Sequence, residues 1–440
     1  MTRTYRIGCG AGFSSDRLPP AVDLVEQGEL DCLILECIGE RTLAFAQRDR
    51  RRDPNAGYNP YLERRMQALL PVARAASTKI VTNMGVANPL AAGEKTAQIA
   101  KSLGIDDLRI AVLTGDDVTA SITHDTALWE GGTVASIDGE LISANAYLGA
   151  EAMADAMAAD VVITGRVADP SLVVAPLAQH FGWALNDWPI LAAGTLAGHL
   201  LECGMQVTGG YFADPGYKDV PDLANCGYPL IEFDATGSMQ ITKLASAGGL
   251  VNLATVKEQL LYEVHDPAAY LTPDVTANFA AVEMTETGPN RVQLDGVTGA
   301  PRPGMLKATV GFDGGFLAEA GVSYAGPGAA ARAELARTIL KERLHGLNAK
   351  IRFDLIGVDS LHATAKVAAD SNPQDVRLRT AVRTRDPEIA EQVLWETEAI
   401  LCCGPAGGGG FRRSLTPSIV TYSTSIDRTA VKPEITWITS

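Results

Sequence analysis

The sequence lacks several patterns that assign a protein to a class at once. It contains no stretch of about 18 uncharged apolar residues, so we expect no membrane span. Its beginning, MTRTYRIGCGAGF, has no apolar run of signal-peptide length. No CxxC pair occurs, which disfavours a structural zinc site, and the seven cysteines are scattered and odd in number. Such usage is typical of reduced thiols rather than of a disulfide framework, so we expect a cytoplasmic protein.

Positive charge is also scarce. The 440 residues include 37 Lys and Arg against 52 Asp and Glu, which gives a formal net charge of −15. A protein of this charge repels phosphate backbones, so we expect no nucleic-acid partner. An anionic substrate, such as a coenzyme A thioester, needs locally placed cations or backbone N–H groups. The length exceeds what one hydrophobic core usually serves, so we expect two domains.

Short apolar runs alternate with helix-like stretches in the first part of the chain. Helix-like stretches such as 61–76 and 96–103 have apolar residues at three- and four-residue spacing. Strands that alternate with helices indicate βαβ units, and runs that are apolar throughout indicate strands buried on both faces. We predict an α/β domain over residues 1–275, Rossmann-like, with a parallel sheet and helices on both faces. The predicted strands lie at residues 4–7, 32–35, 79–81, 108–113 and 161–164.

The pattern changes near residue 276. The segments 306–312 and 316–324 resemble strands, and Asp313-Gly314-Gly315 between them is typical of a hairpin turn. Further strands are indicated at residues 292–296, 351–356 and 376–382, and helices are indicated at residues 329–344 and 388–401. This order predicts a smaller α+β domain over residues 276–440. Its Gly-rich carboxyl-terminal segment, 404–413, ends in Arg412-Arg413 and suits either an anion cradle or a flexible linker.

The carboxyl ends of the five predicted parallel strands are polar and rich in glycine. In open α/β sheets, ligands bind in the crevice outside these ends. Each loop by itself also suits an ordinary turn, because Gly, Asn and Asp favour turns. Taken together, the loops predict a shared pocket. The side chains and backbone groups that we expect to line it come from Gly10, Glu36, Asn83, Asp116 and Arg166.

The first of these loops imitates a dinucleotide-binding fingerprint. GCGAG follows a predicted strand, and Glu36 ends the next strand. The spacing is GxGxG rather than GxGxxG, and Pro19-Pro20 delays the helix whose N-terminus would face a phosphate. We therefore expect no strong nucleotide-cofactor motif, and we expect the N–H groups of Gly10 and Gly12 to hold an anionic group of a substrate.

Carboxylates accumulate at the same strand ends. Glu36, Glu40, Asp116, Asp117 and Asp169 can meet there as paired acid and base, or as ligands of Mg²⁺ or another divalent cation. Like charges close together also raise one pKa, as general acid catalysis requires. Helix N-capping is the alternative for Asp116 and Asp117, because Val-Thr-Ala-Ser follows them.

Other polar residues complete the candidate site. Arg166 suits an anion clamp, or it pairs with Asp169 and stiffens the loop. His199 and Glu202 lie one helical turn apart and suit a base and its orienting acid, although a structural histidine is the alternative. Cys203 suits a nucleophile or a buried thiol.

A polar loop follows this helix. Thr208 and Gly209 begin a flexible segment, TGGY, that we expect to contact substrate.

A series of motifs runs in order from residue 6 to about residue 410. They are RIGCGAGFSSDR, ECIGERT, TNMGVANP, TGDD, SANAYLGA, GRVADPSL, AGHLLECGMQVTGG, YEVHDPAAYLTPDV, SYAGPGA and GPAGGGG. In this order they resemble the acyclic terpene utilisation (AtuA) family. The resemblance implies a place beside geranyl-CoA carboxylase in citronellol and geraniol breakdown, or in a related branched acyl-CoA pathway. It carries over no settled catalytic residue. Members commonly have a small ferredoxin-like domain, fused or separate, so the resemblance implies a separate small subunit of that kind as partner.

These observations favour an enzyme that acts on a small or CoA-linked branched acid by a lyase- or hydratase-type reaction. We expect catalytic roles for Glu36, Asp116, Asp117, His199 and Glu202. A hydrolase or acyl transferase with a Cys or Ser nucleophile, a non-catalytic acyl-CoA-binding or scaffold subunit, and a nicotinamide-dependent oxidoreductase are the alternatives. We also expect a homo-oligomer.

Overall fold

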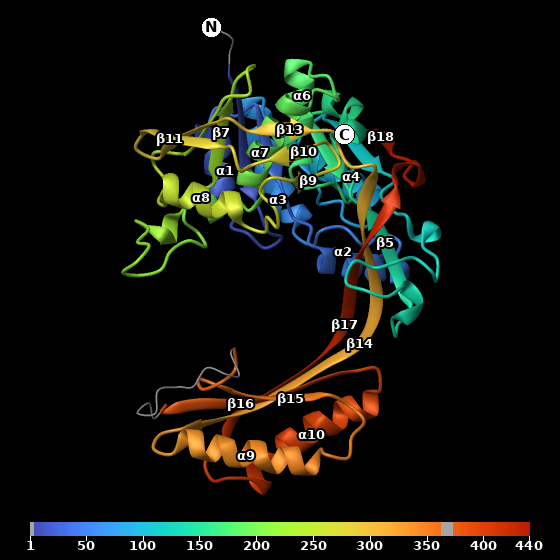
Figure 1. Ribbon diagram of the computed structural model, residues 1–440, viewed down its shortest axis with the longest axis vertical. Coiled ribbons are helices and arrows are strands. Elements are labelled where there is room, and N and C mark those ends of the chain that lie inside the picture. Colours follow the sequence, from blue (N-terminus) through green and yellow to red (C-terminus); the bar gives the residue numbers. More distant parts are fainter. Residues whose placement is uncertain (1–3, 362–372) are drawn as a thin grey trace. The chain divides into compact units, whose positions relative to one another are not determined.

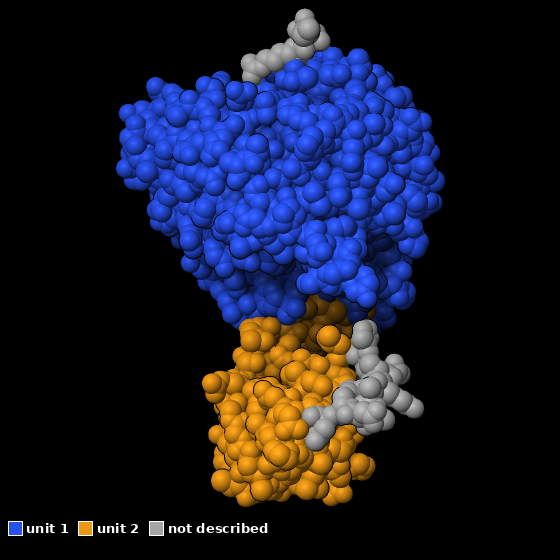
Figure 2. Space-filling view, turned by 90° about the vertical axis from the view of Figure 1, so that its left-hand side faces the viewer, with its two compact units in different colours: residues 1–136, 142–311, 421–440 blue, residues 137–141, 312–420 orange. Residues whose placement is uncertain are grey.

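The computed structural model describes residues 4–361 and 373–440 and forms two compact units. The larger contains residues 1–136, 142–311 and 421–440, and the smaller contains residues 137–141 and 312–420 (Figure 2). This division differs from the expected boundary at residues 275 and 276. Residues 276–311 and 421–440 belong to the larger unit because they supply strands that are hydrogen-bonded into its sheets.

The larger unit is built on a ten-stranded mixed sheet of order β11-β12-β8-β7-β1-β2-β3-β6-β4-β18 (Figure 1). Its middle strands are parallel: β1 (Tyr5–Ala11), β2 (Cys32–Leu35), β3 (Lys79–Thr82), β6 (Val161–Thr164) and β4 (Arg109–Thr114). The flanking strands are antiparallel: β7 (Pro229–Phe233), β8 (Met239–Lys243), β12 (Arg291–Asp295), β11 (Glu283–Gly288) and β18 (Glu434–Thr439).

The five strands predicted for residues 4–164 all form in this sheet, and the prediction of parallel pairing holds for the middle of the sheet. It is wrong at both edges, because hairpins and the returning carboxyl terminus add antiparallel strands there. The chain is therefore a mixed α/β protein, and its likeness to a Rossmann fold stays a prediction.

Helices cover both faces of the sheet, and the strand sequences explain why. In β2, Cys32 and Ile34 belong to one hydrophobic core, and Leu33 and Leu35 belong to the other. Because successive side chains of a strand point to opposite faces, such a run needs cover on both sides. One core includes α1 (Pro19–Gln27), α3 (Leu62–Ala76) and α4 (Pro89–Ser102), and the other includes α6 (Ser171–Phe181), α7 (Trp188–Glu202) and α8 (Leu253–Leu261).

Short elements complete this unit. They are α2 (Glu40–Arg52), β5 (Leu141–Ala146), α5 (Ala150–Met153), β9 (Tyr270–Leu271), β10 (Thr276–Asn278) and β13 (Thr298–Ala300). β9, β10 and β13 form a three-stranded sheet, and β10 and β13 pack on α7. Within residues 4–361 and 373–440, no helix is long and apolar enough to cross a membrane.

The smaller unit contains four strands and two helices among the described residues, and the outer ends of its strands β14 and β17 belong to the larger unit. Its elements are β14 (Met305–Ala325), α9 (Ala329–Arg343), β15 (Ile351–Ile356), β16 (Asp375–Thr384), α10 (Pro387–Cys403) and β17 (Gly409–Asp427). The strand order β15-β16-β14-β17 with this βαββαβ connectivity is the ferredoxin-like arrangement. Both helices lie on the same side of the sheet and share one core with it (Figure 1).

The structure of this unit differs from two local predictions. The hairpin turn expected at Asp313-Gly314-Gly315 is wrong, because β14 runs through these residues as one strand and pairs with β16 from Phe316 onward. In the Gly-rich segment, Gly409 already begins β17, and Arg413 forms an ion pair with Glu391. The segment is therefore not a free linker.

Candidate functional site

A pocket of about 860 Å³ opens at the carboxyl ends of β1 and β2 in the larger unit. It is walled by these strand ends, by the loop after β6, by the end of α7 and by the segments that follow α7 and α8. The polar residues that line it and that matter for its chemistry are Glu36, Glu40, Arg166, Asp169, Glu202 and Cys203.

Gly12 determines how closely α7 approaches β1. A Cβ atom at this position would lie 2.3 Å from the carbonyl carbon of Cys203 and 2.4 Å from the carbonyl oxygen of Glu202. Only glycine permits this contact, which brings the end of α7 to the pocket. The N–H group of Gly12 donates to Oδ2 of Asp16 at 2.9 Å, so it serves the loop itself.

Arg166 lies under the pocket and is 2% exposed. Its Nη2 donates to Oδ1 of Asp169 at 2.6 Å, and its Nη1 donates to the carbonyl oxygen of Ile38 at 2.8 Å. The guanidinium also lies 4.0 Å from the ring centroid of Tyr147. Burial alone would lower the pKa of Arg166, but Asp169 and the other surrounding acids raise it. The ion pair that the sequence allowed is therefore present, and it places a permanent positive charge at the pocket floor.

Glu36 and Asp169 are the acids whose protonation is most perturbed. Burial, followed by the charge of Asp169, raises the pKa of Glu36 well above its usual range, although Asn83 and the N–H of Ile38 donate to its Oε1. Burial also raises the pKa of Asp169 to about 7; Glu202 and Glu40 add to this effect, and Arg166 opposes it. Neighbouring acids of this kind resist simultaneous ionisation. With a pKa of about 7, Asp169 therefore exchanges a proton close to neutral pH.

Glu40 has the opposite character. The hydroxyl of Tyr147 donates to its Oε1 at 2.6 Å, and Nζ of Lys307 lies 3.2 Å from the same oxygen. Burial alone would raise the pKa of Glu40, but this hydrogen bond and the charges of Arg166 and Lys307 lower it to about 2. The pocket thus combines a carboxyl group whose pKa is lowered, Glu40, with two whose pKa values are raised, Glu36 and Asp169.

His199 and Glu202 form a hydrogen-bonded pair at the end of α7. Nε2 of the buried His199 ring lies 3.1 Å from the carbonyl oxygen of Leu260, which can only accept, so Nε2 carries a hydrogen. Nδ1 lies 2.9 Å from Oε1 of Glu202. Through this contact, His199 holds the carboxyl group of Glu202 at the pocket. The other oxygen, Oε2 of Glu202, is buried and has no hydrogen-bond partner among the described residues.

Asn83 and Asp116 lie behind the pocket and support it. Asn83 donates to Glu36 at 2.9 Å, and its Oδ1 accepts from the N–H of Cys37 at 2.7 Å. Oδ2 of Asp116 accepts from the N–H of Arg166 at 3.0 Å and from Nδ2 of Asn145 at 2.8 Å. Burial raises the pKa of Asp116 to about 6. From beneath the pocket, Asn83 therefore positions Glu36, and Asp116 positions Arg166.

The remaining predicted residues form local structure. Gly10 lies against Leu35 and Ala21 of α1, where a Cβ atom would crowd their side chains. Oδ1 of Asp117 accepts from the N–H and the hydroxyl of Thr119, which is a capping-type turn. Thr208 donates to the carbonyl oxygen of Gly227 at 2.7 Å, and Gly209 follows with a φ of +103°. None of these residues lines the pocket, and their contact with a substrate stays a prediction.

Sequence reasoning missed Tyr147 and Lys307. Neither residue directly follows a parallel strand of the sheet, so the pattern of strand ends did not predict either of them near the pocket. Tyr147 does lie within the SANAYLGA motif, whereas no sequence signal marked Lys307. The rim was missed as well: Phe13 is 63% exposed and Tyr211 is 75% exposed, and both line the pocket.

The residues that the structure describes contain no group of three His, Cys, Asp or Glu side chains arranged to hold a metal ion.

Comparison with known proteins extends this description. A family model described as acyclic terpene utilisation family protein AtuA matches residues 5–437 of the chain. No curated protein and no solved structure matches it. The family match spans both compact units and every residue of the pocket.

Proposed function

Because this chain belongs to the AtuA family of acyclic terpene utilisation, we propose that it is an enzyme of branched or acyclic terpene acyl-CoA catabolism. We further propose a hydratase- or lyase-type reaction on a small or CoA-linked acid. One observation carries this proposal: the pocket places Asp169, an acid with a pKa of about 7, together with Glu202, which is hydrogen-bonded to His199. Acid–base groups work best when their pKa lies near the operating pH.

Water addition to a branched α,β-unsaturated acyl group illustrates the roles. Ionised Asp169 takes a proton from water while the oxygen bonds to the β-carbon, and the double-bond electrons move toward the α-carbon and the acyl oxygen. Glu202, which lines the pocket and is hydrogen-bonded to His199, then gives a proton to the α-carbon in this scheme. Arg166, which is paired with Asp169, offsets the negative charge that develops.

A thiol nucleophile has less support. Burial, followed by the charge of Glu202, raises the pKa of Cys203, so the thiolate that would attack an acyl group is scarce. This argues against a hydrolase or acyl transferase that uses Cys203.

The decisive experiment is a turnover assay on the purified chain with a panel of branched enoyl-CoA and 3-hydroxyacyl-CoA thioesters. We expect uptake of ¹⁸O from labelled water into the product, detected by mass spectrometry. Absence of turnover across the panel would overturn the proposal, and tight binding without turnover would favour a binding or scaffold subunit. A separate small ferredoxin-like partner is part of the proposal, and co-purification from the native host tests it.

A further inference from the structure

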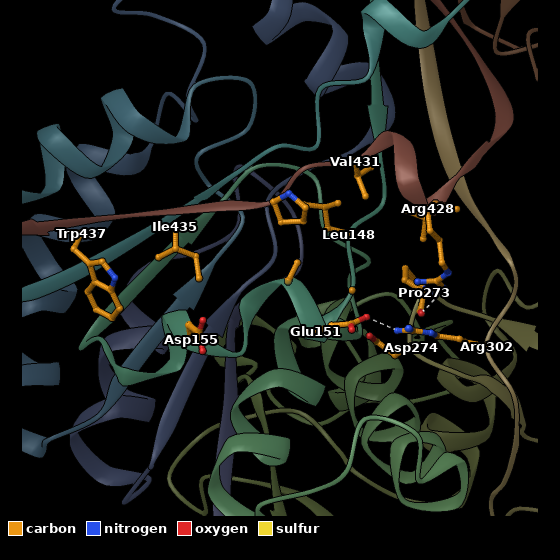
Figure 3. Close-up of a pocket in the computed structure, with 14 residues that line it drawn as sticks. Leu148, Glu151, Asp155, Pro273, Asp274, Arg302, Arg428, Val431, Ile435 and Trp437 are labelled. Carbon is orange, nitrogen blue, oxygen red and sulfur yellow. Dashed lines mark hydrogen bonds and ion pairs between the residues drawn. The ribbon is translucent and has the colours of Figure 1, made fainter.

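A second cavity, of about 670 Å³, lies elsewhere in the larger unit (Figure 3). It is formed by α5 and its flanking residues, by Pro273 and Asp274, by Arg302 and Leu306, and by the extended segment that leads into β18. It shares no lining residue with the strand-end pocket. Cavities of this size typically accommodate small organic ligands.

One wall of the cavity is an apolar stripe. It is formed by every second residue of an extended segment, namely Val431, Pro433, Ile435 and Trp437. Extended backbone places alternate side chains on one face, and six steps of about 3.3 Å extend the stripe to roughly 20 Å. Ile438, from the alternate set, lies instead against Gly93 of α4. Trp437 is 50% exposed, so the stripe ends in an open indole face.

The other end of the cavity is cationic. Nε of Arg428 donates to the carbonyl oxygen of Pro303 at 3.0 Å, and Nη2 donates to that of Pro273 at 2.6 Å. These bonds fix the guanidinium and leave Nη1 without a hydrogen-bond partner in the part of the chain that the structure describes. Arg302 lines the same end of the cavity as Arg428 (Figure 3), and its charge adds to burial in lowering the pKa of Arg428.

The acids of the cavity leave room for an anion beside these arginines. Both oxygens of the buried Asp274 are already occupied, because Oδ1 accepts from the N–H of Ala150 and Oδ2 accepts from the hydroxyl of Ser171. Glu151 pairs with Nη1 of Arg302 at 2.5 Å, but its side chain is 59% exposed. Exposed ion pairs are weak because water screens them. A bound anion can therefore displace Glu151 from Arg302.

We propose that this cavity binds an amphipathic aliphatic carboxylate. Its carboxylate lies between Arg302 and Arg428, and its chain extends along Val431, Ile435 and Trp437. A planar carboxylate matches the guanidinium fork, and it also replaces Glu151 with a group of the same kind. The stripe is longer than an extended medium-chain fatty acid, so it can hold the whole aliphatic chain of such a ligand.

Calorimetric titration of the full chain with octanoate, 1-octanol and octylammonium tests this inference. We expect octanoate to bind at least about tenfold more tightly than 1-octanol, because a charge-assisted hydrogen bond is lost in the alcohol. Arg302→Gln weakens octanoate binding about tenfold and leaves 1-octanol binding unchanged. Trp437→Ala weakens both ligands by similar factors.

Matched controls distinguish the cavity from the general surface. Arg291→Gln removes another exposed arginine that pairs with a glutamate, Glu232, and Trp129→Phe changes another exposed tryptophan. Both leave octanoate affinity unchanged. The inference is overturned if octanoate does not bind, if Arg302→Gln binds it as tightly as the unaltered chain, or if octylammonium binds more tightly. Each readout is an affinity, so the result does not depend on the proposed activity.

Discussion

Nδ1 of His199 lies 2.9 Å from Oε1 of Glu202, while the opposite nitrogen of the same ring faces the carbonyl oxygen of Leu260. The ring of His199 thus links Glu202, which lines the strand-end pocket, to Leu260 of α8. Because the ring is buried, these two contacts hold the carboxyl group of Glu202 in position at the pocket.

The ring of His199 gives the first prediction. Nitrogen-15 NMR of the imidazole groups will show Nε2 of His199 protonated from pH 6 to pH 8, because the carbonyl oxygen of Leu260 accepts its hydrogen. The exposed His124 will instead exchange between tautomers and serves as the reference. A His199 signal with hydrogen on Nδ1 and none on Nε2 would contradict the assignment.

Turnover gives the second prediction. With Asp169 acting as base and its pKa at about 7, the rate will fall as the pH drops below about 7, approaching tenfold per pH unit, because the protonated carboxyl cannot accept a proton. Asp169→Asn and Glu202→Gln will each reduce turnover by about 10²- to 10⁴-fold.

The control for this series is Glu258→Gln, an exposed carboxylate on α8 that pairs with Lys218. It will retain full turnover. A rate that is independent of pH between 6 and 8 would exclude Asp169 as the base.

Asp116 gives the third prediction, which concerns stability. Its carboxyl has a pKa of about 6 in the folded chain, against about 4 in the unfolded chain, so the folded state binds more protons between these values. This contribution to stability is complete below about pH 4 and is lost as the pH rises through about 6. Asp116→Asn retains an acceptor for the N–H of Arg166 and removes the buried charge. At pH 8 it will raise the free energy of unfolding by about 2 kcal/mol.

The difference between Asp116→Asn and the unaltered chain will shrink as the pH falls from 8 to 4, measured by denaturant unfolding. Asp117→Asn is the matched control, since it changes an exposed aspartate on the same loop. Equal stability of Asp116→Asn and the unaltered chain at pH 8 would show that the buried charge carries no net cost.

Gly12 gives the fourth prediction. Gly12→Ala will lower the free energy of unfolding by about 1–3 kcal/mol, because its Cβ atom meets the backbone of Glu202 and Cys203, which cannot rotate away. Gly39→Ala is the control: the nearest atom to its Cβ is Oγ1 of Thr42 at 3.8 Å, so we expect a change within about 0.5 kcal/mol. Denaturant unfolding of the two variants provides the comparison. Equal stabilities would show that α7 moves to accommodate the methyl group.

The middle of the sheet was predictable from the sequence because its strands are apolar on both faces. Runs such as Cys32–Leu35 and Val161–Thr164 are short and almost entirely apolar, so they are expected to form strands buried between helices. The polar loops after them were predictable for the same reason, since parallel strands all end at one edge. Glu36 and Arg166 follow two of these strands, and they do line one pocket.

The antiparallel edges and the layering of the site were decided by tertiary structure. Asn83 and Asp116 also follow parallel strands, but hydrogen bonds turn them beneath Glu36 and Arg166 instead of into the pocket. Lys307 reaches Glu40 across a sequence separation of 267 residues, a contact that no local pattern encodes.

The sequence by itself determined which residue types stand at the strand ends, because burial of β-strands and the direction of parallel pairing follow from local apolar runs. Tertiary structure decided their protonation. The pKa values of Glu36, Asp169 and Glu40 depend on burial and on charges that distant segments bring near, and the proton held by His199 depends on a carbonyl group 61 residues away. Electrostatic interactions depend on distance and burial rather than on sequence spacing, so the chemistry of the pocket emerged only with the fold.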